Sequence, residues 1–157
     1  DSTSQNIQIA TNKIQIINES DKNIKIKSGS ATFNNTNKII TAANGVIISD
    51  SHNNGSTLKT SQLNWNLNNS NIYLDKELFI KLPNTNIYSK QATYNIDLDS
   101  LNLQGVIFKR THDNKNGLSY YEITIDSDNT KWLKENNSLE FTSNKEQVET
   151  TIDLFNY

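Results

Sequence analysis

The amino-acid sequence predicts an all-β protein of antiparallel strands whose sheet curls into a barrel, a jelly roll or a half-pipe, that is, an open trough. The chain of 157 residues is rich in Ile, Thr, Tyr and Phe, which favour strands. Apolar and polar residues alternate along many segments, and no segment keeps a convincing helical period over three turns. Short runs of Asn and Ser separate these segments, and such runs are typical of turns.

The composition limits what such a fold can contain. Hydrophobic residues make up 34% of the chain and the mean hydropathy is -0.68, so the core must be thin. A net charge of -2 with 1 Pro and 5 Gly argues against disorder, and the lack of a basic excess argues against nucleic acid as a partner. The absence of Cys excludes disulfides and thiolate chemistry.

The N-terminal segment is polar and already resembles a strand. Its first 22 residues contain one or two predicted strands, within NIQIATNKIQII. The sequence shows neither a signal peptide nor an apolar run near the roughly 20 residues that a membrane helix needs. We therefore expect either a cytosolic protein or one whose targeting or anchoring segment precedes residue 1.

A pattern that occurs four times follows this segment, in units that begin at Ile26, Leu58, Ile87 and Ile125. Each unit has Ser or Thr at offset +2, an aromatic residue at +7 and apolar residues at +14 and +16. Alternation resumes at +5, an odd interval that breaks the parity in every unit. A β-bulge near offsets +2 to +4, as in residues 60–62, accounts for the break and predicts a curled sheet.

The second strand of a unit keeps one parity over a longer distance. Residues 72–82 form one such predicted strand, which Pro83 ends because proline cannot donate to a sheet ladder. Gly45 and Gly105 are expected at bulges or at close approaches of the backbone. The longest irregular link covers residues 111–120. We therefore predict a core domain at 1–110 and an additional β unit at 111–157 that completes or extends the same sheet.

No group of residues has the spacing of a catalytic or metal-binding site. His52 and His112 lie in polar loops, Asp97 and Asp99 lie at a predicted turn, and residues 126–137 lack the Gly and Glu of a calcium loop. No Ser or Thr has a neighbouring His or a G-x-S-x-G setting. We predict no enzyme activity, no metal and no cofactor. The apolar face is then either an ordinary core or the lining of a groove for an apolar ligand.

Three segments share a recurring arrangement of Gly-Val, Leu-x-Thr and an aromatic residue. They are KIITAANGVIIS, GSTLKTSQLNWNLNNSNIYLDKELFIKL and NIYSKQATYNIDLDSLNLQGVIF, with the motif residues Gly45, Val46, Gly55, Leu58, Thr60, Trp65, Gly105 and Val106. Over about residues 23–108 the chain thereby resembles the LptC/LptA (OstA-like) superfamily of lipopolysaccharide transport proteins. The order and spacing are most similar to LptC, the member that is anchored in the inner membrane.

The resemblance implies a periplasmic bridge component that binds lipopolysaccharide and passes it from the inner-membrane ABC transporter toward the outer membrane. Its jelly roll would be open along one side, and the acyl chains would lie in the trough. Other Lpt proteins, namely the transporter complex and an LptA-like protein, would pair with the edge strands at residues 6–17 and 139–155. An N-terminal helix that is absent from this sequence would tether the protein to the inner membrane.

The inward positions of the repeat are the predicted lipid-binding residues. They are Phe33, Ile40, Leu58, Leu63, Trp65, Ile72, Leu74, Ile87, Tyr94, Leu101, Leu103, Trp132, Leu139 and Phe141. The alternative is a β-sandwich adhesin or carbohydrate-binding module, in which Tyr73, Tyr88, Tyr120 and Tyr121 present their rings to sugars.

Overall fold

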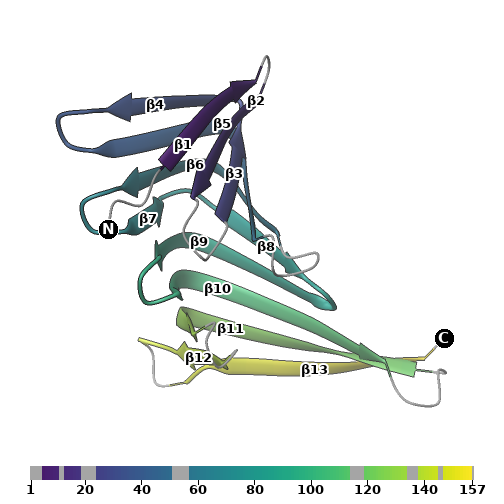
Figure 1. The fold of residues 1–157 in the computed structure, drawn as a ribbon. Coiled ribbons are helices and arrows are strands. Elements are labelled where there is room, and N and C mark those ends of the chain that lie inside the picture. The colour runs from purple at the N-terminus through teal and green to yellow at the C-terminus, as the bar shows by residue number, and fades with distance from the viewer. Residues whose placement is uncertain are drawn as a thin grey trace.

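The structure is a computed structural model that describes residues 5–10, 13–18, 24–50, 57–113, 119–133, 138–144 and 147–156, with side chains from residue 25 onward except at 50 and 156. This part of the chain contains strands and no helix, as Figure 1 shows, so the all-β prediction is confirmed. The strands are β1 (Gln5–Ala10), β2 (Lys13–Asn18), β3 (Ile24–Ser28), β4 (Ser30–Asn34), β5 (Ile39–Asp50), β6 (Thr57–Asn66), β7 (Asn71–Leu74), β8 (Leu78–Leu82), β9 (Thr85–Asn95), β10 (Ser100–Asp113), β11 (Ser119–Leu133), β12 (Ser138–Thr142) and β13 (Glu149–Asn156).

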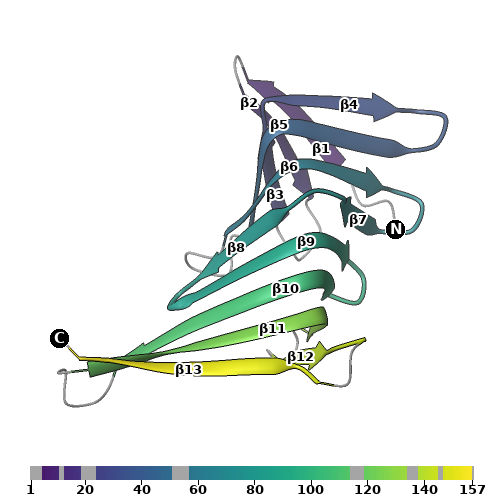
Figure 2. The same ribbon diagram turned by 180° about the vertical axis from the view of Figure 1, so that it is seen from behind.

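All strands of the described part belong to one antiparallel sheet. Its continuous order is β1-β2-β3-β5-β6-β7-β9-β10-β11-β12, while β4 pairs with β5, β8 pairs with β6 and β9, and β13 pairs with β11. Thus β3 and β4 share the long neighbour β5, β7 and β8 share β6 and β9, and β12 and β13 share β11. The long strands extend past both of their short neighbours and connect the two parts of the sheet (Figure 1, Figure 2).

The sheet therefore has two halves that meet along a line, which we call the corner. Half-sheet A contains β4, β7, β12 and the adjoining parts of the long strands. Half-sheet B contains β1, β2, β3, β8, β13 and the remaining parts of the long strands. In Figure 1, β4, β7 and β12 lie to the left of the bend, and β8 and β13 lie to its right.

At the corner the buried positions of a strand change parity. In β9, Ser89 and Ala92 are both buried, and the two residues between them are exposed. The same interval of three separates buried residues in the other strands, at Thr60 and Leu63 in β6, Leu103 and Val106 in β10, and Ser127 and Thr130 in β11. The break in alternation that the repeat predicted is therefore confirmed, and it marks the place where each strand bends.

A bulge was expected at offsets +2 to +4 of every unit, as at residues 60–62 of β6. The structure instead places the extra residue in the partner strand β5, and it has no register shift between β9, β10 and β11. The pairing of β5 with β6 shifts by one residue between Ala43 and Val46, where Asn44 and Gly45 have φ values of 63° and 80°. Across Gly105, in contrast, the register of β10 with both neighbours continues unchanged. Three adjacent strands that change parity at the same level stay in register, so no extra residue is needed there.

The continuous strand predicted for residues 72–82 is also wrong. The structure ends β7 at Leu74 and begins β8 at Leu78. Three residues lie between β7 and β8 at the corner, whereas in β6 two residues lie there, between the buried Thr60 and Leu63. The unequal lengths interrupt the ladder, and the Thr60 hydroxyl donates a hydrogen bond of 3.3 Å to the carbonyl of Glu77 within the gap.

The Ser or Thr at offset +2 of each unit makes hydrogen bonds at the corner. In three units its hydroxyl donates to the carbonyl two residues further on, from Ser28 to Ser30 at 3.0 Å, from Thr60 to Gln62 at 3.3 Å and from Ser89 to Gln91 at 2.7 Å. In the fourth unit the hydroxyls of Ser127 and Thr130 are 2.9 Å apart. In three of the four units, the side chain at offset +2 therefore satisfies backbone groups where the sheet bends.

Asparagine at offset +8 shapes three of the hairpin turns. The carboxamide oxygens of Asn34, Asn66 and Asn95 accept backbone N–H groups from Thr36, Asn68 and Leu98 at 3.0, 2.9 and 2.8 Å. The last residues of these turns, Lys38, Ser70 and Asp99, have positive φ values. These hydrogen bonds from backbone N–H groups to the carboxamide give a structural reason for asparagine at these positions beyond the overall composition.

Candidate functional site

The candidate site is the apolar interior between the two half-sheets. Buried side chains from both halves form one cluster. Half-sheet A contributes Trp65, Leu74 and Leu103, whereas half-sheet B contributes Ile87 and Val106, and all five are at most 2% exposed. Since alternate residues of a strand lie on opposite faces, this surface is separated by the sheet from the polar outer face.

The structure gathers the predicted lining residues in this interior with one exception. Nine are buried, namely Ile40, Leu63, Trp65, Ile72, Leu74, Ile87, Leu101, Leu103 and Trp132. Leu58, Tyr94, Leu139 and Phe141 are partly buried and pack against them. Phe33 lies on the edge strand β4, where it is 46% exposed and has the Lys38 ammonium 5.9 Å from its ring centre.

The prediction omitted several interior residues of half-sheet B. Val46, Leu78, Ile80, Val106 and Phe108 are all buried in the same cluster. They follow offset +16, the last position that the repeat marks in each unit. They could have been predicted from the sequence, because apolar and polar residues alternate again after each parity break, which places Val106 and Phe108 on one face.

Two phenylalanine rings close the interior at the side of the edge strand β12. Phe141 of β12, in half-sheet A, meets Phe108 of β10, in half-sheet B, with ring centres 5.4 Å apart and an interplanar angle of 72°. This edge-to-face geometry is favourable for aromatic rings. Because the two rings come from opposite halves, this contact must separate if the halves move apart at this margin.

The same margin contains a polar atom with no partner. Trp132 of β11 is paired across the sheet with Leu101 of β10 and Leu139 of β12. Its indole Nε1 is buried, and the described part of the chain offers it no hydrogen-bond acceptor. By comparison, the Tyr94 hydroxyl donates a 2.6 Å hydrogen bond to Asp99.

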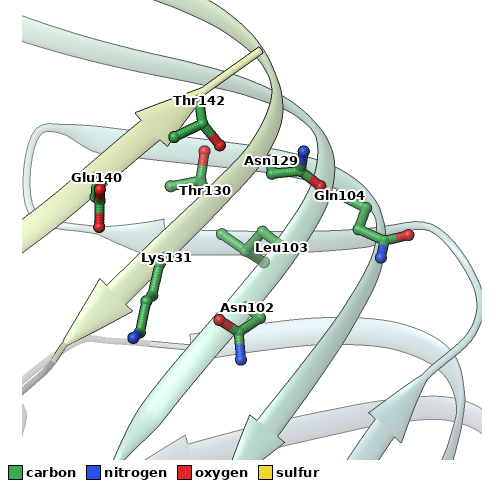
Figure 3. A pocket seen from close by; sticks show the side chains of 8 residues that line it. All are labelled: Asn102, Leu103, Gln104, Asn129, Thr130, Lys131, Glu140 and Thr142. Carbon is green, nitrogen blue, oxygen red and sulfur yellow. The ribbon is translucent and has the colours of Figure 1, made fainter. Parts of the chain in front are cut away.

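The outer face of β10, β11 and β12 has a shallow polar depression of about 280 Å³ (Figure 3). It is lined by Asn102, Leu103, Gln104, Asn129, Thr130, Lys131, Glu140 and Thr142. Lys131 and Glu140 occupy paired positions on adjacent strands. This lining contains no His or Cys.

Of the two histidines, the structure describes His112. His112 packs its ring 5.0 Å from that of Tyr121, and no cluster of three or more His, Cys, Asp or Glu is found among the described residues. His52 lies outside the described residues, as do positions 134–137 of the rejected calcium loop. The described part also has no helix that is long and apolar enough to span a membrane.

The tyrosines of the carbohydrate-binding alternative do not share one surface. Tyr120 and Tyr121 are consecutive in β11 and therefore point to opposite faces. Tyr120 stacks on Phe155 at 4.9 Å, whereas Tyr88 lies 4.8 Å from Phe79 on another part of the sheet. The Tyr73 hydroxyl is engaged by the carboxamide groups of Asn69 and Asn71.

Comparison with known proteins identifies the family of this bent sheet. The family model described as "Lipopolysaccharide-assembly, LptC-related" matches residues 1–111, which is more than half of the 157 residues. The chain belongs to this family. The resemblance read from the sequence is therefore confirmed, and β11, β12 and β13 extend the sheet of this LptC-related chain beyond the matched residues. A search of the curated proteins gave no match.

A solved structure supports the same fold for the LptC-related chain. It is the crystal structure of LptH from Pseudomonas aeruginosa, described as the LptA homologous periplasmic component of the conserved lipopolysaccharide transport device. The TM-score is 0.58 at 11% sequence identity, and the match covers 85% of this chain and 94% of LptH. The shared architecture confirms the predicted β-jelly roll.

Proposed function

We propose that this chain is a periplasmic bridge component that holds the acyl chains of lipopolysaccharide between its half-sheets and passes the lipid from the inner-membrane ABC transporter toward the outer membrane. Its membership in the LptC-related family carries this proposal. The structure supports it with a bent sheet whose two inner faces form one apolar cluster. The protein acts by binding and has no catalytic role.

Lipid entry requires the two half-sheets to move apart, because their inner side chains are packed against one another. Leu63, Ile72, Leu74 and Ile87 are fully buried. Transfer of a chain of about twelve carbons from water gains on the order of 10 kcal/mol before costs. The contact between Phe108 and Phe141 is worth about 1 kcal/mol beyond its buried area. The gain from the lipid therefore exceeds the cost of opening this aromatic contact.

Site-specific photo-crosslinking tests where the lipid lies. A benzophenone amino acid at Phe141, which is partly buried and faces the interior, should capture lipopolysaccharide in cells. The matched control is Glu140, the preceding residue of β12, which is exposed. A second pair consists of the buried Leu103 and the exposed Asn102 on β10. Equal capture from the inner and outer members of both pairs would refute the interior as the lipid site.

The edge strands are the proposed contacts with other Lpt proteins, an expectation that follows from the family. In the described sheet β1 and β12 are the ends of the continuous order, and β13 has one paired side, formed with β11. An unpaired strand edge presents backbone groups that a partner strand can bind. Crosslinkers at exposed Thr151 on β13 should capture an Lpt protein, identified by mass spectrometry, whereas crosslinkers at exposed Tyr88 on the central strand β9 should not.

A helix that precedes the present sequence is the proposed tether to the inner membrane. Resemblance to LptC, the anchored member of the superfamily, supports this part of the proposal. The product of the complete gene should stay with inner membranes after a carbonate wash. Its release into the soluble periplasmic fraction would instead indicate an LptA-like component.

A further inference from the structure

The orphaned indole nitrogen of Trp132 requires an explanation. The side chain is 7% exposed, and Nε1 is the buried side-chain nitrogen or oxygen that lacks a hydrogen-bond partner in the described part of the chain. Buried tryptophan nitrogens usually find an acceptor, and each exception in a native structure calls for a reason. A donor without an acceptor costs stability, so a role outside the folding of this domain is expected.

The surroundings of this nitrogen determine what can satisfy it. The cross-strand neighbours of Trp132 are Leu101, which is buried, and Leu139, which is partly buried. Thr130, the nearest polar residue on the same face of β11, shares its hydroxyl contact with Ser127 at 2.9 Å. A water molecule needs two or more polar partners to stay in a buried position, and these aliphatic neighbours supply none. The suitable acceptor is a single oxygen on an otherwise apolar group.

We propose that Trp132 Nε1 donates a hydrogen bond to the carbonyl oxygen of an ester- or amide-linked acyl chain. Leu101 and Leu139 would contact the methylene groups on either side of that carbonyl. This inference rests on the proposed function, because it assumes that acyl chains enter the interior. It adds a specificity that an apolar lining cannot provide, since the lining alone does not distinguish an acyl chain from an alkyl chain.

The position of Trp132 fits the polarity of such a lipid. β11 is followed in the sheet by β12, the last strand of the continuous order. Trp132 therefore lies one strand from the margin that Phe108 and Phe141 close. The carbonyl of an acyl chain is next to the polar headgroup, which must remain in water. An indole donor one strand from the margin can bind the carbonyl while the hydrocarbon continues toward the deeper, fully buried part of the interior.

A pair of lipids that differ only in the carbonyl tests this inference. The probes are 1-acyl lysophosphatidylglycerol and its 1-O-alkyl ether analogue of the same chain length, with lipopolysaccharide as a reference ligand. Titration calorimetry on the natural protein should give about five- to tenfold tighter binding of the ester, which lies within the usual range for one hydrogen bond. Trp132→Phe should lose this preference, and it should bind the ether with nearly unchanged affinity.

Two further variants separate the hydrogen bond from packing. Replacement of Trp132 by benzothienylalanine keeps the size of the indole but substitutes sulfur for the N–H. This variant should lose the ester preference without a loss of thermal stability, because it removes an unsatisfied donor. The matched control is Tyr88→Phe, which removes a polar donor from an exposed aromatic residue of β9 outside the interior. This control should retain the preference for the ester.

The possible results lead to different conclusions. Natural protein that binds lipopolysaccharide but shows equal affinity for ester and ether would overturn the inference and leave the proposed function intact. The same holds if the benzothienylalanine variant keeps the ester preference. Natural protein that binds none of the three ligands would overturn both the inference and the proposed function.

Discussion

Replacement of Ser89 by alanine tests the claim that a repeated hydroxyl holds the bend of the sheet. Ser89 is 4% exposed at the corner of β9. Its Oγ lies 2.7 Å from the carbonyl oxygen of Gln91 and 2.8 Å from that of Gln104, and it accepts the backbone N–H of Gln104 at 3.2 Å. Ser89→Ala removes all three contacts while leaving the backbone and the apolar cluster unchanged.

The expected loss of stability follows from the groups that lose their partner. A buried donor or acceptor left unsatisfied costs about 1–3 kcal/mol, so we expect Ser89→Ala to lower the free energy of unfolding by about 2 kcal/mol. For a chain of this length, that loss corresponds to a decrease of about 4–8 °C in Tm. The urea midpoint should fall by about 1 M if the m-value is near 2 kcal/mol/M.

Urea unfolding followed by tryptophan fluorescence measures this change, because Trp65 and Trp132 are both buried in the folded protein. The matched control is Ser61→Ala, in which the hydroxyl removed lies at the same corner but on an exposed residue of β6. The control should stay within about 0.5 kcal/mol of the natural protein. If the two variants have the same stability, the hydroxyl of Ser89 does not hold the corner, and the reading of offset +2 is wrong.

Three further changes test other parts of the structure. Gly105→Ala should lower the free energy of unfolding by about 1–3 kcal/mol in chemical denaturation, because residue 105 has a φ of 60° and a Cβ would lie 2.8 Å from Cδ of Lys90; a matched Gln104→Ala on the outer face should be milder. Asn95→Ala removes the acceptor for the Leu98 N–H and should lower the free energy of unfolding by about 1 kcal/mol. Asn69→Ala removes the acceptor for the Asn71 N–H and should lower it by a similar amount if the side-chain hydrogen bond, rather than the position of the residue next to a strand, determines the loss. Phe108→Cys with Phe141→Cys, joined by a short reducible crosslinker, should abolish lipopolysaccharide binding until the link is reduced, since the two half-sheets cannot then separate; unchanged binding by the linked protein would show that lipid enters elsewhere.

The periodicity of the sequence predicted most of the interior residues of half-sheet A. Alternation places the side chains of Leu63 and Trp65 on one face whatever the partner strands are, because it is a property of the extended backbone. The odd interval from Leu58 to Leu63 likewise located the corner, since a strand that buries residues on both sides of a bend must change parity there. Phe33 obeys the same pattern but is exposed, because β4 is an edge strand and has a paired neighbour, β5, on one side.

The residues that make hydrogen bonds at the corner and at the turns recur in the sequence, but the sequence did not show why. Ser or Thr recurs at offset +2, and Asn recurs at +8 in three units. Their hydrogen bonds to backbone groups appear only when the bend and the turns have formed. The repeated positions could have predicted a structural role for these residues, but composition offered a simpler explanation for the asparagines.

The sequence by itself determined the all-β class, the face that most strands present to the interior, the place of the bend and, through its motifs, the LptC-related family. Tertiary structure decided whether a parity change needs an inserted residue, because that depends on how many residues the neighbouring strand uses at the same level. It also decided that Phe108 and Phe141 meet and that the nitrogen of Trp132 lacks a partner. Those features depend on the distance between two half-sheets, and a pattern within one strand contains no information about that distance.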